Sequence, residues 1–315
     1  MFTPHTRTLP LELLFIILDL LISTDHLPTL ARLIRIHPTF QPTIERALYT
    51  HRTHFPSRSS HLAYLATCAQ NTRLAALVRR YHLASPTPTS TSGFHHPSTS
   101  SSSAWHKDDI DKVVAAVSNM RNLKHFVVDM WMHNPFDPED LFSALAHTQL
   151  ESFEWSTWCR KEEVADLIRT QPGLRYIKTQ FLRAPEVPLG KECCRGLWYV
   201  CGDRALLEAL VPGREVRVVV WTPLVYEGDR PVTAALAQGI DRLRALAFDG
   251  KRMKTLPLHL LSGLGKRLEV LQVTCHLSSH KFFPDVLHHM KHLESIIIIC
   301  ATEKEDNWQR DKRSL

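Results

Sequence analysis

The sequence predicts an α/β protein in which a short helical segment at the N-terminus precedes a curved array of repeated helix–strand units. Two observations lead to this fold class. A strongly apolar stretch near the N-terminus has the spacing of a helix. From residue 108 onward, a helical stripe and a short apolar strand recur with a period near 25 residues. Because such units bury apolar surface against their neighbours, the strands are expected to form one parallel sheet lining a concave face.

The composition is that of a globular protein. Of 315 residues, 44% are hydrophobic, and the formal net charge is +6. Basic and acidic residues are intermixed without a block of five like charges, so no nucleic-acid-binding surface is predicted. The chain has seven cysteines and no N-x-Ser/Thr sequence. An intracellular protein with reduced thiols, in the cytoplasm or the nucleus, is therefore expected.

The first predicted helix covers residues 9–22. Pro10 suits a first helical turn, and Glu12 suits the positive end of the helix dipole. The stretch is too short to cross a bilayer, so no membrane contact is predicted. Its aliphatic residues fall on two faces. One face has the spacing i, i+3, i+4, i+7 and holds Leu13, Ile16, Ile17 and Leu20; the other holds Leu14, Leu18 and Leu21.

Two shorter helices are predicted next, over residues 29–36 and from Pro42 to near Tyr49. The first of these ends at His37-Pro38, because proline disfavours helix in the residue before it. Three short helices are too few to enclose a comfortable core. They could cover one face of the first helix and leave the other face for a partner.

This arrangement resembles the F-box of fungal, basidiomycete-like F-box proteins. The resemblance rests on Leu9-Pro10-x-Glu12-Leu13, on Leu30-Ala31-Arg32-Leu33, on Phe40 and on the closing stretch 45–49. It implies an F-box domain over residues 1–50, with its core at 9–49. It further implies docking on a Skp-type adaptor and, through it, on a cullin–RING ubiquitin ligase. The candidate adaptor-binding residues are Leu9, Pro10, Leu13, Ile16, Ile17 and Leu33. The sequence does not separate those facing the adaptor from those in the domain's own core.

Residues 51–84 are predicted to form a connecting helix and a first repeat strand within 77–83. Residues 85–104 are predicted to be a disordered insert, because twelve of the 19 residues at 85–103 are Ser or Thr and three are Pro. The repeat domain is predicted over 105–302, with a loose tail at 303–315. Its first helix is expected over 108–120.

The repeat strands share the form apolar-x-x-apolar-x-apolar. Their predicted first residues are Leu123, Leu150, Leu174, Cys194, Val216, Leu243, Leu268 and Leu293. A strand and a helix at this period are typical of leucine-rich repeats, here in a degenerate form. Alternate side chains of each strand should point to the concave face. Eight of them are candidate target-binding residues: His125, Asp129, Glu154, Lys178, Gln180, Trp198, Asp249 and Gln272.

Catalytic motifs do not support an enzyme. The Gly263–Arg267 stretch lacks the spacing of a phosphate loop. Cys159, Cys193, Cys194 and Cys201, and a second group at Cys275, His276, His288, His289 and His292, lack the knuckle spacing of common zinc sites. We therefore expect no cofactor and no metal. The sequence favours a substrate-recognition subunit of a ubiquitin ligase. A repeat scaffold outside any ligase and a metal-dependent enzyme remain the alternatives.

Overall fold

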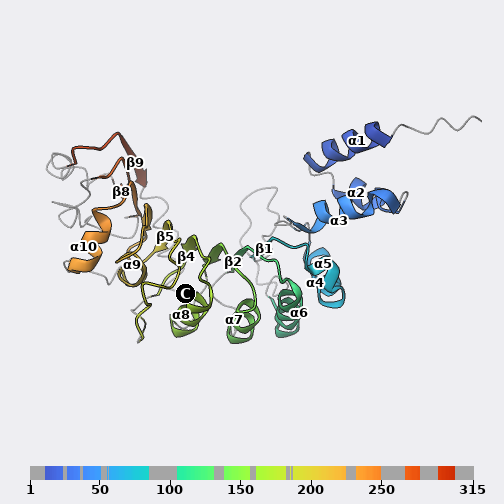
Figure 1. The fold of residues 1–315 in the computed structure, drawn as a ribbon, viewed down its shortest axis with the longest axis horizontal. Helices are drawn as coiled ribbons and strands as arrows, with labels where there is room; N and C mark the ends of the chain where they lie inside the picture. Colours follow the sequence, from blue (N-terminus) through green and yellow to red (C-terminus); the bar gives the residue numbers. More distant parts are fainter. Residues whose placement is uncertain are drawn as a thin grey trace, which may run out of the picture.

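The computed structural model describes residues 11–23, 27–35, 38–50, 55, 57–84, 105–130, 138–156, 161–181, 185, 187–224, 232–249, 267–276 and 290–301. It is an α/β protein. The strands of these residues form one nine-stranded parallel sheet whose spatial order follows the chain. Figure 1 shows the strands along an arc, with α6, α7 and α8 on its outer side.

The N-terminal region contains α1 (Leu11–Ser23), α2 (Leu27–Leu33), the short 3-10 helix η1 (Pro38–Phe40) and α3 (Gln41–Thr50). Next come α4 (Arg58–Gln70), α5 (Thr72–Ala75), β1 (Arg80–Ala84), α6 (Lys107–Asn119), β2 (His125–Asp129), α7 (Glu139–Leu145), β3 (Ser152–Trp155) and α8 (Lys161–Thr170). The remaining elements are β4 (Tyr176–Lys178), β5 (Tyr199–Gly202), α9 (Arg204–Leu210), β6 (Val218–Trp221), α10 (Ala234–Ile240), β7 (Ala245–Asp249), β8 (Val270–His276) and β9 (Ser295–Ala301).

These elements agree with most of the sequence pattern. The helix predicted over 108–120 lies within one residue of α6, and the three N-terminal helices are found, with α2 ending at Leu33 rather than at residue 36. The predicted insert at 85–104 and the predicted tail at 303–315 lie outside the described residues.

A ladder of buried side chains explains the period of the units. Leu123, Phe126 and Val128 are fully buried. The register pairs Phe126 with Phe153 and Val128 with Trp155, so equivalent positions of successive units pack on each other. The Phe126 and Phe153 rings stack with their centroids 6.4 Å apart. The core therefore continues from unit to unit rather than closing around a centre.

The predicted register of the fifth unit is wrong by three residues. The sheet pairs Ile177 with Val200, which makes Leu197, rather than Cys194, the first apolar position of this unit. The reason is an additional turn at 191–196, in which Cys194 has a φ of 53°. Cys194 is nevertheless buried, and a buried cysteine in a turn has the same apolar character as a buried residue in a strand. The sequence pattern therefore could not distinguish the two. Consequently Trp198 lies just before β5 and not at a concave-face position.

Arg214 holds this irregular part of the chain together. Its side chain is only 4% exposed. The guanidinium donates hydrogen bonds to the carbonyls of Leu189, Gly190, Cys193, Ala209 and Leu210, at 2.6–3.4 Å. Burial lowers the pKa of this guanidinium. One buried side chain thus binds carbonyl groups from both the turn before β5 and the end of α9.

The N-terminal helices have a core of their own that meets the repeat core at one edge. The N-terminal core cluster consists of Leu18, Leu30, Phe40, Ile44 and Leu48. Tyr49 packs against this cluster and also against the repeat core.

A stacked pair and an ion pair make that connection. The Tyr49 ring stacks on Tyr64 of α4 with a centroid distance of 5.4 Å. Arg73 of α5 donates two hydrogen bonds to the buried carboxylate of Glu45, at 2.6 and 2.9 Å. The two parts of the molecule are therefore joined by specific contacts.

Replacing Arg214 with Met should lower the free energy of unfolding by about 3 kcal/mol, because several buried carbonyls lose their donor. Urea denaturation followed by circular dichroism measures this change. Arg195→Met is the matched control, since Arg195 is exposed. A loss for Arg214→Met no larger than that of the control would contradict the structural role of this side chain.

The Glu45–Arg73 pair predicts a specific pH dependence. The hydrogen bonds from Arg73 hold the pKa of Glu45 below its ordinary value of 4.5, despite the opposing effect of burial. The pair therefore stabilises the fold above pH 4.5, and this contribution is lost as the pH falls through the lowered pKa. Urea denaturation at several pH values should show wild type more stable than Glu45→Gln at neutral pH, with the difference shrinking in acid. A difference that stays constant with pH would exclude this linkage.

Candidate functional site

The first helix has one covered face and one exposed face. Leu18 is 2% exposed and belongs to the N-terminal core cluster, and Leu14 and Leu21 pack against that cluster from either side. The other members of the cluster come from α2, η1 and α3, which therefore cover this face of α1. The helix therefore contributes to its own small core with only part of its apolar surface.

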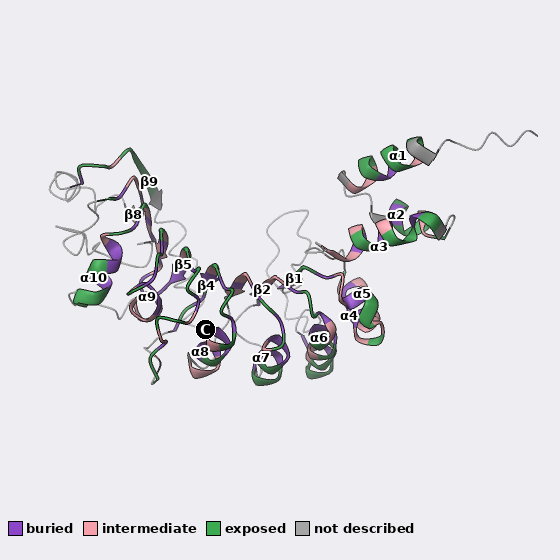
Figure 2. Cartoon of the chain, viewed as in Figure 1, coloured by how far each residue is buried: buried purple, intermediate pink, exposed green. Residues whose placement is uncertain are grey.

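The opposite face of α1 is aliphatic and faces solvent. We call it the α1 aliphatic face; it consists of Leu13, Ile16, Ile17 and Leu20, which are 47%, 63%, 44% and 61% exposed. Figure 2 shows most of α1 in the colour of exposed residues. Four large aliphatic side chains on adjacent helical turns form a contiguous patch, and contiguous patches of this kind mark interaction sites in folded proteins.

The structure brings together three of the six predicted adaptor-binding residues, since Leu13, Ile16 and Ile17 all lie on this face. Leu33 is half-buried against the N-terminal core cluster, so it serves the domain's own core. Leu9 and Pro10 lie outside the described residues. Leu20, which the prediction omitted, shares the i+7 position of the same helical stripe and could have been included on that ground.

The inner face of the sheet is the second candidate surface. The side chains of β2 alternate in burial, with His125, Val127 and Asp129 on the less buried side. The register aligns Val127 with Glu154 and Glu154 with Lys178. The Lys178 ammonium lies 3.3 Å from the Glu154 carboxylate. Corresponding positions of different strands thus form rows across the sheet.

The predicted target-binding residues spread along these rows rather than meeting at one point. Glu154 and Lys178 are ion-paired neighbours, and the Gln180 amide donates to the Thr222 hydroxyl at 3.5 Å. Asp249 and Gln272 lie on β7 and β8, several strands away from β2. They form a polar band and no catalytic cluster.

An aromatic pair that the prediction missed lies within this band. Tyr176 and Tyr199 occupy the same row and stack with a centroid distance of 4.2 Å. Burial raises the pKa of Tyr176, and the neighbouring Tyr199 adds to the rise. The prediction missed this pair because its register for the fifth unit was wrong by three residues. That register assigned Tyr199 to a buried position instead of the concave face.

The cysteines of this region behave as core residues. The Cys194 thiol lies 3.3 Å from the Gln171 carbonyl, and burial raises the thiol pKa to about 12. Burial likewise raises the pKa of Cys201 to about 11. Cys159, His288 and His289 lie outside the described residues. Within the residues that the structure does describe, no group of three or more His, Cys, Asp or Glu side chains is placed to hold a metal ion.

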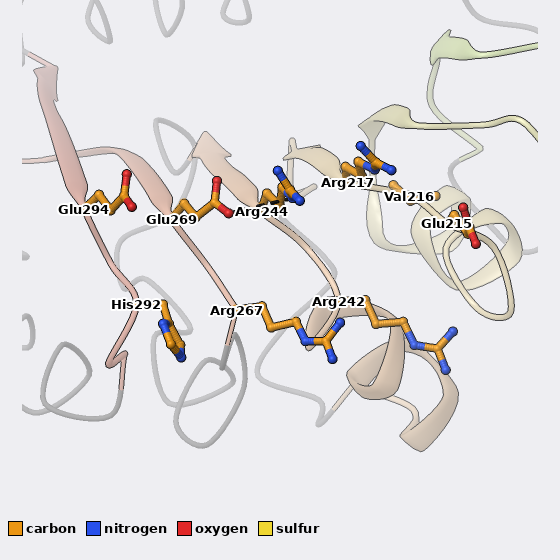
Figure 3. A pocket seen from close by; sticks show the side chains of 9 residues that line it. All are labelled: Glu215, Val216, Arg217, Arg242, Arg244, Arg267, Glu269, His292 and Glu294. Carbon is orange, nitrogen blue, oxygen red and sulfur yellow. Dashed lines mark ion pairs between the residues drawn. The ribbon is translucent and has the colours of Figure 1, made fainter.

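A third surface, which the sequence analysis did not identify, is a hollow of about 610 Å³ at the edge where the last four strands begin. Figure 3 shows its side chains in two rows. We call it the arginine hollow. One row contains Arg217, Arg244, Glu269 and Glu294, the other contains Arg242, Arg267 and His292, and Glu215 lies at the end next to Arg217 and Val216.

The two rows follow from the repeat itself. Each member of the first row directly precedes its strand, and each member of the second row lies two residues earlier. Arginine at both positions of one unit, as in Arg242-x-Arg244, is a signal that could have been found by aligning the units at their first leucine. The hollow combines guanidinium and carboxylate groups, and it can therefore bind charged partners.

No model of a known protein family matches the chain, and the curated proteins contain no match to it either. Among the helices of the described residues, none has both the length and the apolar character needed to cross a bilayer.

Proposed function

We propose that this protein is a substrate-recognition subunit of a Skp–cullin–F-box ubiquitin ligase. In this proposal residues 9–50 are an F-box that docks on a Skp-type adaptor. The sheet and its helices are a degenerate leucine-rich-repeat solenoid that holds a target protein.

The observation that carries the proposal is the exposure of the α1 aliphatic face. On one face of α1, Leu18 is 2% exposed and packs within the N-terminal core cluster. On the other face, Ile16 is 63% exposed. Leaving four large aliphatic side chains in water is unfavourable by about 25 cal/mol per Å² of apolar surface. An adaptor helix or groove covering this face would remove that cost, and the resemblance to an F-box assigns the docking surface to the same segment.

The sheet supports the second half of the proposal. Nine parallel strands in chain order, with helices such as α6, α7 and α8 on the outer side, leave a broad inner face without a covering layer among the described residues. Polar and aromatic side chains such as Glu154, Lys178 and Tyr176 occupy this face. Mixed aromatic and charged surfaces of this kind suit the binding of a protein.

In this role the chain performs no bond chemistry. It would hold a target by the repeat surface and the ligase by α1, and so raise the local concentration of a target lysine beside a charged conjugating enzyme. Tethering alone converts an encounter between two molecules into a step within one complex.

The double substitution Ile16→Ser with Leu20→Ser tests the proposed docking surface. Burying one such side chain contributes about 1.5–3 kcal/mol, so two losses should weaken adaptor binding by about a hundredfold or more. Both side chains are over 60% exposed in the free chain. The free energy of unfolding should therefore change by no more than about 0.5 kcal/mol. Titration of the purified chain with a Skp-type adaptor measures the affinity.

A matched control is Val187→Ser with Ile297→Ser, which removes two exposed aliphatic side chains outside α1. This variant should bind the adaptor as wild type does. If wild type fails to bind the adaptor at micromolar concentration, or if the α1 variant binds it as tightly as the control, the ligase proposal is wrong. A repeat scaffold independent of the ligase would then be the better description.

A further inference from the structure

We propose that the arginine hollow binds a short acidic peptide segment of a partner protein. The inference concerns a surface at the opposite end of the chain from α1 and requires no adaptor. It adds a binding chemistry to the proposed function without resting on it.

The register of the sheet creates the charge pattern of the hollow. The Arg244 amide donates to the Arg217 carbonyl at 2.9 Å, and the Glu269 amide donates to the Arg244 carbonyl at 2.8 Å. Arg217, Arg244 and Glu269 are therefore direct neighbours across three units. Arg242 and Arg267 precede Arg244 and Glu269 by two residues and form a second level of positive charge beside the first (Figure 3).

Most of this positive charge has no counter-ion among the described residues. Arg244 lies 3.7 Å from the Glu269 carboxylate. Arg217, Arg242 and Arg267 form no ion pair within the part of the chain that the structure describes, and all three are exposed. Guanidinium groups favour carboxylates because two parallel N–H groups match the two oxygens. These three guanidinium groups, which have no ion-pair partner among the described residues, thus offer separate places around one hollow for several carboxylates.

The dimensions of the hollow fit a peptide segment. It extends across four neighbouring strands, which are about 4.8 Å apart, so its length is about 14 Å. An extended chain advances about 3.3 Å per residue, which gives room for about four residues. A single small anion would occupy only a fraction of the 610 Å³.

The carboxylates of the hollow argue for a peptide and against a nucleic acid. Glu215 and Glu294 lie at the two ends of the rows, and Glu269 lies between Arg244 and Glu294 (Figure 3). A nucleic-acid strand carries a charge on every phosphate and would be repelled at each end. A peptide can place acidic residues opposite Arg217, Arg242 and Arg267 and neutral residues at the ends. The intermixed charge therefore selects a short acidic run with uncharged flanks.

Trp198 extends the surface on the side of the fifth unit. It is 46% exposed and shares a smaller hollow of about 230 Å³ with Glu215 and Arg217, which also line the arginine hollow. An aromatic ring at this place can pack against an apolar side chain that follows the acidic run. Trp198, predicted as a concave-face residue, is thus positioned for a partner of this hollow instead.

The proposal is tested with the purified full chain and a fluorescein-labelled peptide of four glutamates flanked by glycines, followed by fluorescence anisotropy. A peptide with four glutamines in place of the glutamates is the uncharged control. Wild type should bind the glutamate peptide and not the glutamine peptide. Binding should weaken markedly when the salt concentration rises to about 0.5 M, because exposed charges are then screened.

The decisive variant is Arg242→Glu with Arg267→Glu, which should weaken binding of the glutamate peptide by about tenfold or more. Arg80→Glu with Arg121→Glu is the matched control. It reverses two exposed arginines outside the hollow, lowers the net charge equally, and should leave the affinity within about twofold. Equal losses in the two variants would mean that net charge alone attracts the peptide and would overturn the proposal.

Three further readouts separate the alternatives. Tighter binding of a single-stranded oligothymidylate than of the glutamate peptide would overturn the proposal in favour of a nucleic-acid surface. Full competition by millimolar inorganic phosphate would reduce the hollow to a site for a small anion and overturn it as well. The variant in the hollow should keep wild-type affinity for the Skp-type adaptor, so failure of this proposal and failure of the ligase proposal give different results.

Discussion

The parallel register of neighbouring strands is the constraint on which the rest of this structure depends. It sets Phe126 beside Phe153 in the core and Glu154 beside Lys178 on the inner face. Because the strands share this register, side chains at corresponding positions of successive strands lie about 4.8 Å apart. A buried ladder, a polar band and two rows of charge all follow from this single alignment.

The N-terminal end of the molecule presents the α1 aliphatic face, and the edge where the last four strands begin presents the charged arginine hollow. The α1 aliphatic face offers area that is favourable to remove from water, which is the main source of affinity in protein association. The charges of the arginine hollow would contribute mainly to the specificity of binding and to the rate of association. The contacts of Tyr49 with both cores and the Glu45–Arg73 pair connect the N-terminal helices to the repeat units. Such a connection suits a protein that holds two partners at a defined separation.

The fifth unit departs from the repeat, and polar side chains accommodate the departure. The turn at 191–196 inserts residues before β5, and Gly213 adopts a φ of 72° before Arg214. A regular unit would satisfy its carbonyls through the sheet and helix ladders, but this one needs a buried guanidinium. The irregular unit also moves Trp198 to the edge next to the arginine hollow. A local loss of repeat regularity has therefore changed which side chains are exposed at this edge of the sheet.

Hydrophobic spacing by itself determined the α/β class, the period of the units, the positions of most strands and the two apolar faces of α1. These features depend on neighbours in sequence, where a period of 3.6 or 2 residues can be read directly. Tertiary structure decided which face of α1 is covered, because that depends on where Leu30, Ile44 and Leu48 pack. It also decided the register of the fifth unit, since a buried cysteine in a turn and a buried residue in a strand have the same apolar signature. Tertiary structure also formed the arginine hollow: Arg217, Arg242 and Arg267 are distant in sequence, and the register of the strands places their charges on one surface, although their repeated positions can be found by aligning the units.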